Sequence, residues 1–319
     1  MISKLKENRV YRTYLGGRHI DAFIGRDNGK DSNFPEDWTA SVVKAFNPGR
    51  EDIVEGYGMT EDGREIRSIE KVKTRCLVKL LDSAERLVIQ VHPTREDAKK
   101  YFGSDYGKTE CWYFLECDDD ACVYIGFKEG VTAERWRDVF DRQDIPAMLG
   151  MLHKIPVKSG DCIFVEGGIP HAIGKGCFMI EVQEPSDLMG ITERQTPSGR
   201  QLPDIKLHGG IGIDSMMELF RYVEMTEDEV LERYRLSRKS VAEGLFSLVD
   251  SELTDKFSLY ELCDGARLKT GGASGVVIIT EGDGELCGIS VSKGDRLYFT
   301  EEAELLLVSQ NGCKAVACM

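Results

Sequence analysis

The sequence predicts a mainly β protein built from two antiparallel β-barrels with a small helical insert. Short apolar runs bounded by turn residues recur along the chain, which is typical of antiparallel barrels rather than of a wound parallel sheet. One hairpin pattern, V-x-x-G-D-x-x-(F/Y), occurs in VKSGDCIFVEGGIPH (157–171) and again in VSKGDRLYFTEEAEL (291–305). Two copies of one hairpin indicate two halves of similar architecture.

The apolar runs place the strands, and helical periodicity interrupts them in three places. The predicted strands are 76–81, 87–91, 111–115, 122–127, 178–182 and 275–280. The predicted helices are 94–102, with Thr94 as N-cap, 132–152, with a break near Pro146, and 225–235, beginning at Thr226. The segment 195–212 is rich in Pro, Gly and polar residues and predicts a long loop.

Length and composition narrow the class of protein. The 319 residues are enough for two domains, and no window approaches the ~18 apolar residues of a membrane span. The N-terminal residues lack the apolar core of a secretory signal, so we expect a cytoplasmic protein. The net charge of −14 argues against nucleic acid or an anionic membrane as partner, and an anionic small substrate would need a local basic pocket. The 10 cysteines form no C-x-x-C pair and are expected to be reduced.

Polar residues in three strands are the candidates for chemistry. Strand alternation sends Gln90 and His92 of LVIQVHP to one face, and Lys108 and Glu110 of GKTECWYF to another common face. A Gly-Gly-Ile-Pro turn delivers His171 to the start of the next strand. The set offers two imidazoles, a carboxylate and an amide oxygen, which suit Zn²⁺ in a catalytic site.

Each of these residues also has a structural explanation. A histidine beside proline, as at His92, is more often a core or turn residue than a ligand. Glu110 alone is explained by a buried ion pair with Lys108, and Gln90 alone by capping of a sheet edge. The occurrence of all three segments in one chain favours a metal site. In contrast, His19, His153 and His208 have no other candidate ligands near them in the sequence.

The strings QVHP, GKTECWY and IPHAIG, in this order, resemble the metal-site segments of class I (zinc-dependent) mannose-6-phosphate isomerases of the cupin superfamily. PEDWTAS, LVKLLDSAERLVIQVHP and the E-x-Q-E-P-S-D run agree as well, and the likeness covers about residues 10–195 best. The resemblance implies two cupin-like jelly rolls and a sugar-phosphate isomerase.

The resemblance also implies roles for individual residues. One Zn²⁺ per chain is expected on four ligands, namely Gln90, His92, Glu110 and His171. Lys108 is expected to be catalytic, and Asp187 and Lys175 to bind substrate. Relatives commonly carry a catalytic arginine four residues after the aspartate, where this chain has Ile191, so Arg194 is expected to take over that role. The substrate phosphate is expected among four basic residues, Arg194, Lys175, Arg200 and Lys206.

Three functions follow as hypotheses, with the first preferred. They are interconversion of mannose 6-phosphate and fructose 6-phosphate through an enediol, binding of a sugar phosphate without turnover, which Ile191 favours, and iron-dependent oxygen chemistry. The last is disfavoured, because such sites usually carry an H-x-H pair and Gln90 stands first here. A small-molecule sugar phosphate is the expected partner, and the chain is expected to be a monomer or weak homodimer.

The predicted domains follow from the repeat and the motifs. Residues 1–215 are expected to form the catalytic metal-binding domain with its insert at 132–152, residues 216–250 a helical connection, and residues 251–319 a metal-free second domain. Aligned on the Gly-Asp turns, Leu305 stands opposite His171, and the last histidine of the chain is His208.

Overall fold

A computed structural model describes residues 1–69, 76–300, 303–309 and 312–319. The expected repeat at 291–305 therefore includes two residues, 301 and 302, that lie outside the described part. Most strands pair antiparallel in four sheets, so the prediction of a mainly β, antiparallel protein is confirmed.

Two of the sheets belong mainly to the N-terminal two thirds of the chain. The first has seven strands in the order β13 (Arg235–Leu236), β9 (Cys162–Val165), β6 (Glu110–Cys117), β11 (Cys177–Gln183), β4 (Leu77–Ser83), β3 (Glu36–Thr39) and β2 (Arg9–Val10). The second has five, in the order β12 (Gly190–Ile191), β5 (Gln90–Val91), β10 (His171–Ile173), β7 (Cys122–Phe127) and β8 (Leu152–Pro156).

The other two sheets are built almost entirely from the C-terminal part. A seven-stranded sheet has the order β1 (Ile2–Lys4), β21 (Arg296–Phe299), β18 (Gly275–Glu281), β23 (Lys314–Cys318), β16 (Leu259–Leu262), β15 (Leu245–Val249) and β14 (Lys239–Ala242). A four-stranded sheet has the order β17 (Arg267–Lys269), β22 (Glu304–Val308), β19 (Asp283–Leu286) and β20 (Ile289–Ser292).

The helices are short. They are α1 (Arg18–Phe23), α2 (Ile66–Ile69), α3 (Arg95–Asp97), the π-helix η1 (Ala98–Phe102), α4 (Ala133–Asp141), α5 (Ile145–Gly150), α6 (Asp204–His208), α7 (Ile213–Met217) and α8 (Glu227–Tyr234). No helix in the described part of the chain combines the length and the apolar composition that a membrane crossing requires.

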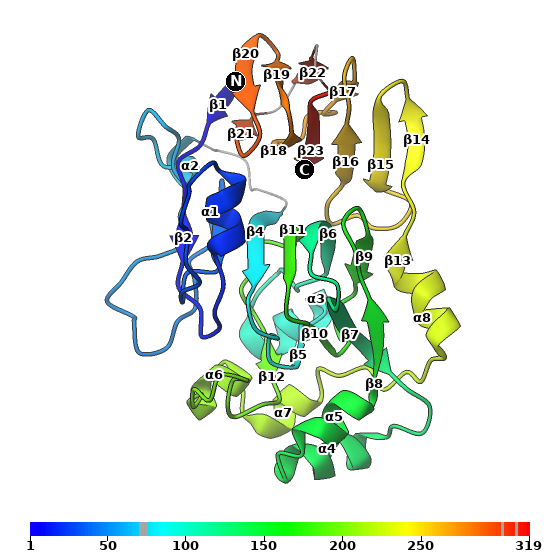
Figure 1. The fold of residues 1–319 in the computed structure, drawn as a ribbon. Helices are drawn as coiled ribbons and strands as arrows, with labels where there is room; N and C mark the ends of the chain where they lie inside the picture. Colours follow the sequence, from blue (N-terminus) through cyan, green and yellow to red (C-terminus); the bar gives the residue numbers. More distant parts are fainter. Residues whose placement is uncertain (70–75, 301–302, 310–311) are drawn as a thin grey trace.

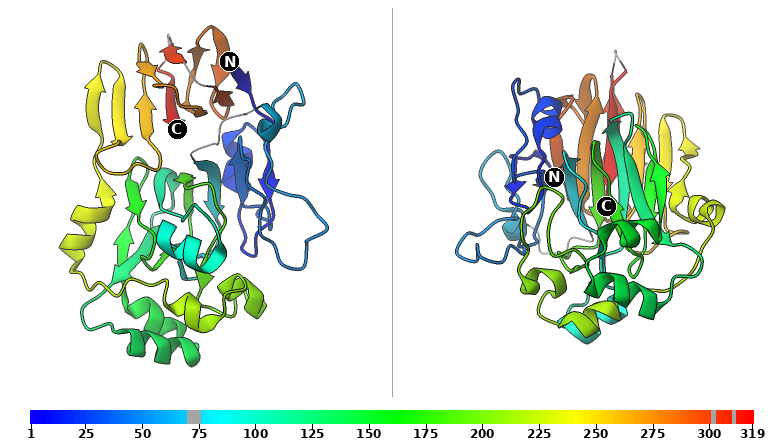
Figure 2. Two further views of the ribbon diagram at one scale, coloured as in Figure 1. Left: turned by 180° about the vertical axis from the view of Figure 1, so that it is seen from behind. Right: turned by 60° about the horizontal axis from the view of Figure 1, so that its bottom comes forward.

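Hydrophobic cores hold the sheets together, and successive residues of one strand pack into different cores. In β6, Cys111 packs into a core shared with the C-terminal sheet, whereas Trp112 packs into a core shared with the five-stranded sheet. In β18, Ile278 faces the first of these cores and Val277 faces the four-stranded sheet. This period of two buries both faces of the seven-stranded sheets. In Figure 1 the C-terminal strands lie at the top and α4, α5, α6 and α7 at the bottom, and the two views in Figure 2 agree.

The repeated hairpin has the same hydrogen bonds in both halves. The Asp161 carboxylate accepts from the Lys158 amide at 3.1 Å, and that of Asp295 accepts from Ser292 at 2.9 Å. The strands after these turns pair in the same register, since Glu110 lies opposite Val165 and Gly275 lies opposite Phe299. Gly275 therefore holds the C-terminal position equivalent to that of Glu110.

The local helix signals are confirmed. The side chain of Thr94 accepts from the Asp97 amide, and Thr132 and Asp144 cap α4 and α5, with the break just before Pro146 as expected. Thr226 forms a full capping box with Glu229 at the start of α8.

Two expectations about the connections are corrected. The segment 195–212 is not entirely loop, because α6 forms after Pro203 and ends at Gly209, whose φ of 56° stops the helix. The connection at 216–250 holds α8 but also strands β13, β14 and β15, and the last two belong to the C-terminal sheet. Their pairing with β16 outweighs the helical pattern before them. The division into domains stays a prediction.

The cysteines behave as expected. None of the 10, all of which lie in the described part of the chain, forms a disulfide, and seven are buried. Cys111 and Cys162 lie side by side on β6 and β9 with their sulfur atoms 3.3 Å apart.

Candidate metal centre and its cavity

The structure brings two histidines and a carboxylate together between the two N-terminal sheets. His171 begins β10, Glu110 begins β6, and His92 follows β5 directly. All three are almost completely buried, and one ligand atom of each lies within 4.8 Å of the others. The rings of His92 and His171 are 4.8 Å apart between centroids. The alternation expected from the sequence is what aims these side chains at one point.

Backbone carbonyls fix the orientation of both imidazoles. Nδ1 of His92 donates to the Leu188 carbonyl at 3.0 Å, and Nδ1 of His171 donates to the Ile169 carbonyl at 2.8 Å. Each ring therefore turns its Nε2 toward the centre, as metal-ligating histidines usually do. Burial, and then the charge of Lys108, lower the pKa of His92 to about 3, so its imidazole is neutral at physiological pH.

Within the part of the chain that the structure describes, two buried atoms of the centre have no hydrogen-bond partner. These are Nε2 of His171 and Oε1 of Glu110, which lie 3.3 Å apart. Buried polar atoms without a partner are unfavourable, and a cation between these two atoms would satisfy both. The donor set of two imidazoles and a carboxylate suits a divalent metal such as zinc.

Lys108 supplies a positive charge to the centre. Its Nζ donates to Oε2 of Glu110 and lies 2.7 Å from Nε2 of His92. Burial alone would raise the pKa of Glu110, but Lys108 and the two histidines hold that pKa well below its usual range. The buried Lys108–Glu110 ion pair that the sequence allowed as an alternative is thus present together with the histidine cluster.

Gln90 lies beside this cluster. It is the strand partner of His171 across β5 and β10, and of Ile191 across β5 and β12. It also lines a cavity that Lys108 lines as well. The cavity therefore lies beside the candidate metal centre, with Gln90 and Lys108 between the two.

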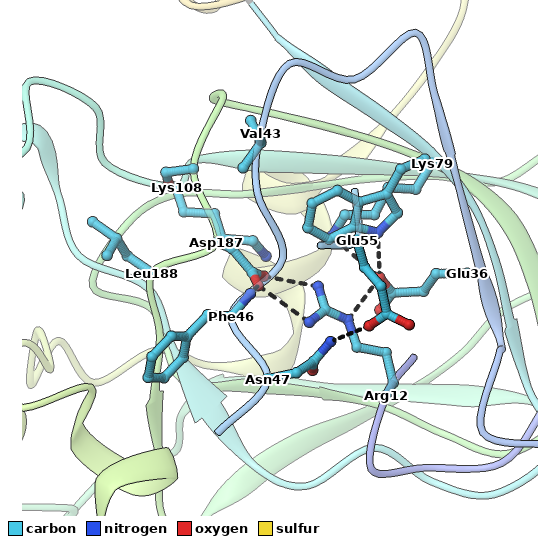
Figure 3. A network of polar contacts seen from close by, with 12 residues as sticks. Arg12, Glu36, Val43, Phe46, Asn47, Glu55, Lys79, Lys108, Asp187 and Leu188 are labelled. Atoms are coloured by element: carbon cyan, nitrogen blue, oxygen red, sulfur yellow. Dashed lines mark hydrogen bonds and ion pairs between the residues drawn. The ribbon is translucent and has the colours of Figure 1, made fainter. Parts of the chain in front are cut away.

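A second group of buried charges forms another wall of the cavity. Arg12 makes a two-pronged contact with Asp187 at 2.9 and 3.1 Å and donates to Glu36 at 2.9 Å. Figure 3 shows the Arg12 side chain lying between these two carboxylates. Glu36 also accepts from Trp38 at 2.6 Å and from Tyr14 at 2.7 Å.

These contacts shift the ionisation of the whole group toward the charged forms. Burial opposes the charge on Arg12, but Asp187 and Glu36 outweigh it and raise the pKa of Arg12 above its usual range. Burial likewise opposes the charge on Glu36, yet Arg12 and Lys79 bring the pKa of Glu36 below its usual range. The cavity wall is therefore a set of ionised groups held in fixed places.

Several of the expected substrate-binding residues lie elsewhere. The Arg194 guanidinium donates to the exposed Asp204 and lies 5.7 Å from the centroid of the Phe140 ring. Lys175 is exposed in the turn between β10 and β11, and Arg200 donates to the Tyr11 hydroxyl. Of the expected phosphate cluster, Lys206 lines the cavity, and Asp187 lines it as well.

Sequence reasoning missed several residues of this wall. Glu36 and Glu181 lie within the strings PEDWTAS and E-x-Q-E-P-S-D, and Lys79 lies within LVKLLDS, so the motifs contained the signal. Arg12 belongs to no such motif, and only its alternation with Tyr14 before a Gly-Gly turn could have indicated it.

The fold and the centre define a class: a protein of stacked antiparallel sheets with a buried two-histidine, one-carboxylate group between two of them. A comparison with models of protein families gives no match. Among curated proteins, the chain is 40% identical over 186 residues to a mannose-6-phosphate isomerase of Streptococcus mutans, covering 57% of each chain. It is also 40% identical over 111 residues to a probable mannose-6-phosphate isomerase of Bacillus subtilis, which covers 35% of this chain and 34% of the relative.

Solved structures share the fold over almost the whole length. Mannose 6-phosphate isomerase from Bacillus subtilis has a TM-score of 0.72 at 21% identity, with 99% of both chains covered. A variant of phosphomannose isomerase from Salmonella typhimurium has a TM-score of 0.73 at 14% identity, again over 99% of both chains. The resemblance to the mannose-6-phosphate isomerases is thus confirmed, with sequence alignments that span about a third to just over half of the relatives' length.

Proposed function

We propose that the chain is a metal-dependent aldose–ketose isomerase that interconverts mannose 6-phosphate and fructose 6-phosphate through an enediol. The observation that carries this proposal is the buried cluster of His92, Glu110 and His171, with two atoms unpartnered among the described residues, beside a cavity lined by charged side chains. The aligned relatives, named as mannose-6-phosphate isomerases, support the substrate.

We propose Zn²⁺ as the metal, with Gln90 as the fourth protein ligand. Two imidazoles and a carboxylate form the donor set of catalytic zinc, and the Gln90 side chain lies next to His171 on the neighbouring strand. When bound, the metal would supply Lewis-acid stabilisation of charge that develops on sugar oxygens. We also propose that each N- or C-terminal pair of sheets is one cupin-like unit.

The chain's own residues position the sugar and hold the proton. Lys108 lies between the centre and the cavity, so its ammonium can donate to an oxygen of the enediol or hold the proton that moves between C2 and C1. Asp187, whose carboxylate accepts from Arg12 and from the Phe46 amide, also lines the cavity, where it can accept from sugar hydroxyls. A direct role of Arg194 stays a prediction, because its guanidinium would have to leave Asp204.

A second candidate function is binding of a sugar phosphate without turnover. The observation in its favour is Ile191, which is 2% exposed and places an apolar side chain in the cavity wall beside Gln90. Relatives commonly carry an arginine at this position, so one charge near the reacting carbons is absent.

A coupled assay on mannose 6-phosphate, with and without added Zn²⁺, tests both candidates. Isomerisation that is lost on chelation and restored by Zn²⁺ is the expected result. Binding of the sugar phosphate without turnover, together with activity that appears in Ile191→Arg, would favour the second candidate instead.

A further inference from the structure

The cavity beside the metal centre concentrates positive charge in an acidic protein. Five cationic side chains line it: Arg12, Lys79, Arg86, Lys108 and Lys206. Three carboxylates line it as well, those of Glu36, Glu181 and Asp187. In a chain of net charge −14, this is a place where cationic side chains outnumber the carboxylates beside them. A cation there that has no carboxylate partner would attract an anionic ligand.

Four of the five cations are already neutralised by carboxylates. Arg12 contacts Glu36 and Asp187, Lys79 contacts Glu181 at 2.6 Å, Arg86 contacts Glu193 at 2.6 and 2.8 Å, and Lys108 contacts Glu110. A ligand that took one of these cations would leave a buried carboxylate without its partner, which is strongly unfavourable.

Lys206 differs from the other four. Within the described residues no carboxylate oxygen lies within 4 Å of its Nζ, which donates to the backbone carbonyl of Phe46 at 2.9 Å. Lys206 is only 5% exposed, on the short helix α6. Its acceptor is a neutral carbonyl, so an anion that binds this ammonium has no ion pair to break.

The place of Lys206 in the fold also favours a ligand. A second cavity adjoins the first, and both are lined by Asp187, Met189 and Lys206. The exposed Lys44 lines the second cavity as well and adds a positive charge there. Lys206 thus lies where the two cavities meet.

We infer that Lys206 binds the phosphate group of the substrate, at the junction of the two cavities. This inference rests on the proposed function only for the identity of the ligand as a phosphate monoester. A dianionic phosphate supplies the charge that the buried ammonium lacks, through charge-assisted hydrogen bonds that are stronger than the bond to Phe46. Burial and the neighbouring Arg12 lower the pKa of Lys206 to about 8, as expected for an ammonium with too few anionic partners.

The test compares Lys206→Met and Lys206→Arg with the parent chain, all loaded with Zn²⁺. A lost charge-assisted hydrogen bond is worth about 1.5–3 kcal/mol, which corresponds to roughly a 10- to 100-fold weaker affinity. Calorimetric titration with inorganic phosphate should show this loss in Lys206→Met and a partial recovery in Lys206→Arg. The KM for mannose 6-phosphate should rise by the same factor, with kcat nearly unchanged.

Lys154→Met, which removes an exposed lysine of β8, is the matched control and should bind phosphate like the parent. Equal phosphate affinity in the parent and in Lys206→Met, or no phosphate binding by the parent, would overturn the inference. If the parent binds phosphate through Lys206 but shows no isomerisation, the proposed function fails and the assignment of Lys206 stands.

Discussion

Nε2 of His171 and Oε1 of Glu110 lie 3.3 Å apart in a space closed to solvent, and neither has a hydrogen-bond partner among the described residues. The Ile169 carbonyl holds Nδ1 of His171 away from the centre, so a cation between the two atoms would satisfy both of them. Single-residue changes at this centre should therefore separate metal binding from folding.

The first prediction is that His171→Ala loses its metal while the chain stays folded. Metal analysis after dialysis should give less than a tenth of the metal content of the parent, since one of the two imidazoles is gone. His153→Ala is the matched control, because His153 is also a buried histidine but its Nε2 contacts the Met225 carbonyl outside the cluster. Full metal content in His171→Ala would contradict the assignment.

The second prediction concerns Lys108→Met. The loss of a proton-holding group should lower kcat by at least about 10²-fold. Without metal, the variant leaves the buried Glu110 carboxylate without its cation, so its free energy of unfolding should fall by about 3 kcal/mol. With metal bound the two chains should unfold at similar temperatures. Unchanged turnover would remove Lys108 from the mechanism, and equal stability of the metal-free chains would remove it from the charge balance.

The third prediction follows from the pKa of Lys206, which is about 8 in the folded chain against a usual value of 10.5. The folded state binds this proton less tightly than the unfolded state, so stability from this group increases as the pH rises from about 8 to about 10.5. The groups that face it are Arg12, Asp187, Glu36 and Lys79. Urea unfolding at pH 7 and pH 10 should show a rise in the parent that is smaller in Lys206→Met.

The pKa of Lys206 should also determine how the KM for the substrate depends on pH. Because the ammonium is the phosphate-binding form, KM should rise above about pH 8 in the parent and stay nearly constant in Lys206→Arg. A KM with the same pH dependence in both chains would contradict a charged Lys206 at the site.

At the scale of the elements, the segment between β11 and β12 joins the two N-terminal sheets and contributes residues to the site. It carries Asp187, and its Leu188 carbonyl orients His92. Asp187 in turn accepts from Arg12 and from the backbone amide of Phe46 at 2.8 Å. One carboxylate therefore fixes two loops and, through its neighbour, one metal ligand.

The fourth prediction is that Arg12→Met destabilises the chain by about 3–5 kcal/mol. The change leaves Asp187 and Glu36 buried without their shared cation, and removal of one partner from a buried ion pair has an effect of this size. The midpoint of urea unfolding measures it. Arg18→Met is the control, since Arg18 is exposed, and should shift the midpoint by much less. Equal midpoints for Arg12→Met and the parent would mean that the buried ion pairs of Arg12 contribute nothing to the free energy of unfolding.

The repeat shows how one element supports chemistry in one half and packing in the other. A side chain at Gly275 would clash with the backbone carbonyl of Cys318 and with the Phe299 ring, whereas the equivalent Glu110 projects into the centre. The strand register is the same in both halves. The C-terminal pair of sheets therefore has the frame of the site without room for its carboxylate.

The whole molecule shows which features could be predicted from sequence. Alternation along LVIQVHP and GKTECWYF predicted the shared location of His92, Lys108 and Glu110, because a period of two fixes the face of a strand. The cavity wall could not be predicted in this way. Arg12 meets Asp187 across 175 positions of the chain, and no local pattern encodes that pairing. The helix α6 was missed because a five-residue helix is too short for helical periodicity to show.

The core between the two seven-stranded sheets carries a last consequence. Cys111 and Ile180 from the sheet of the centre pack there with Val316 and Cys318 from the C-terminal sheet. A metal that binds only the native state stabilises it, so the amide hydrogens of every element that unfolds in the same cooperative unit exchange more slowly. Amide hydrogens of β23 should then exchange more slowly with Zn²⁺ bound, by the same factor as those of β6. Slowing confined to β6 and its neighbours would show that the two halves open independently despite their common core.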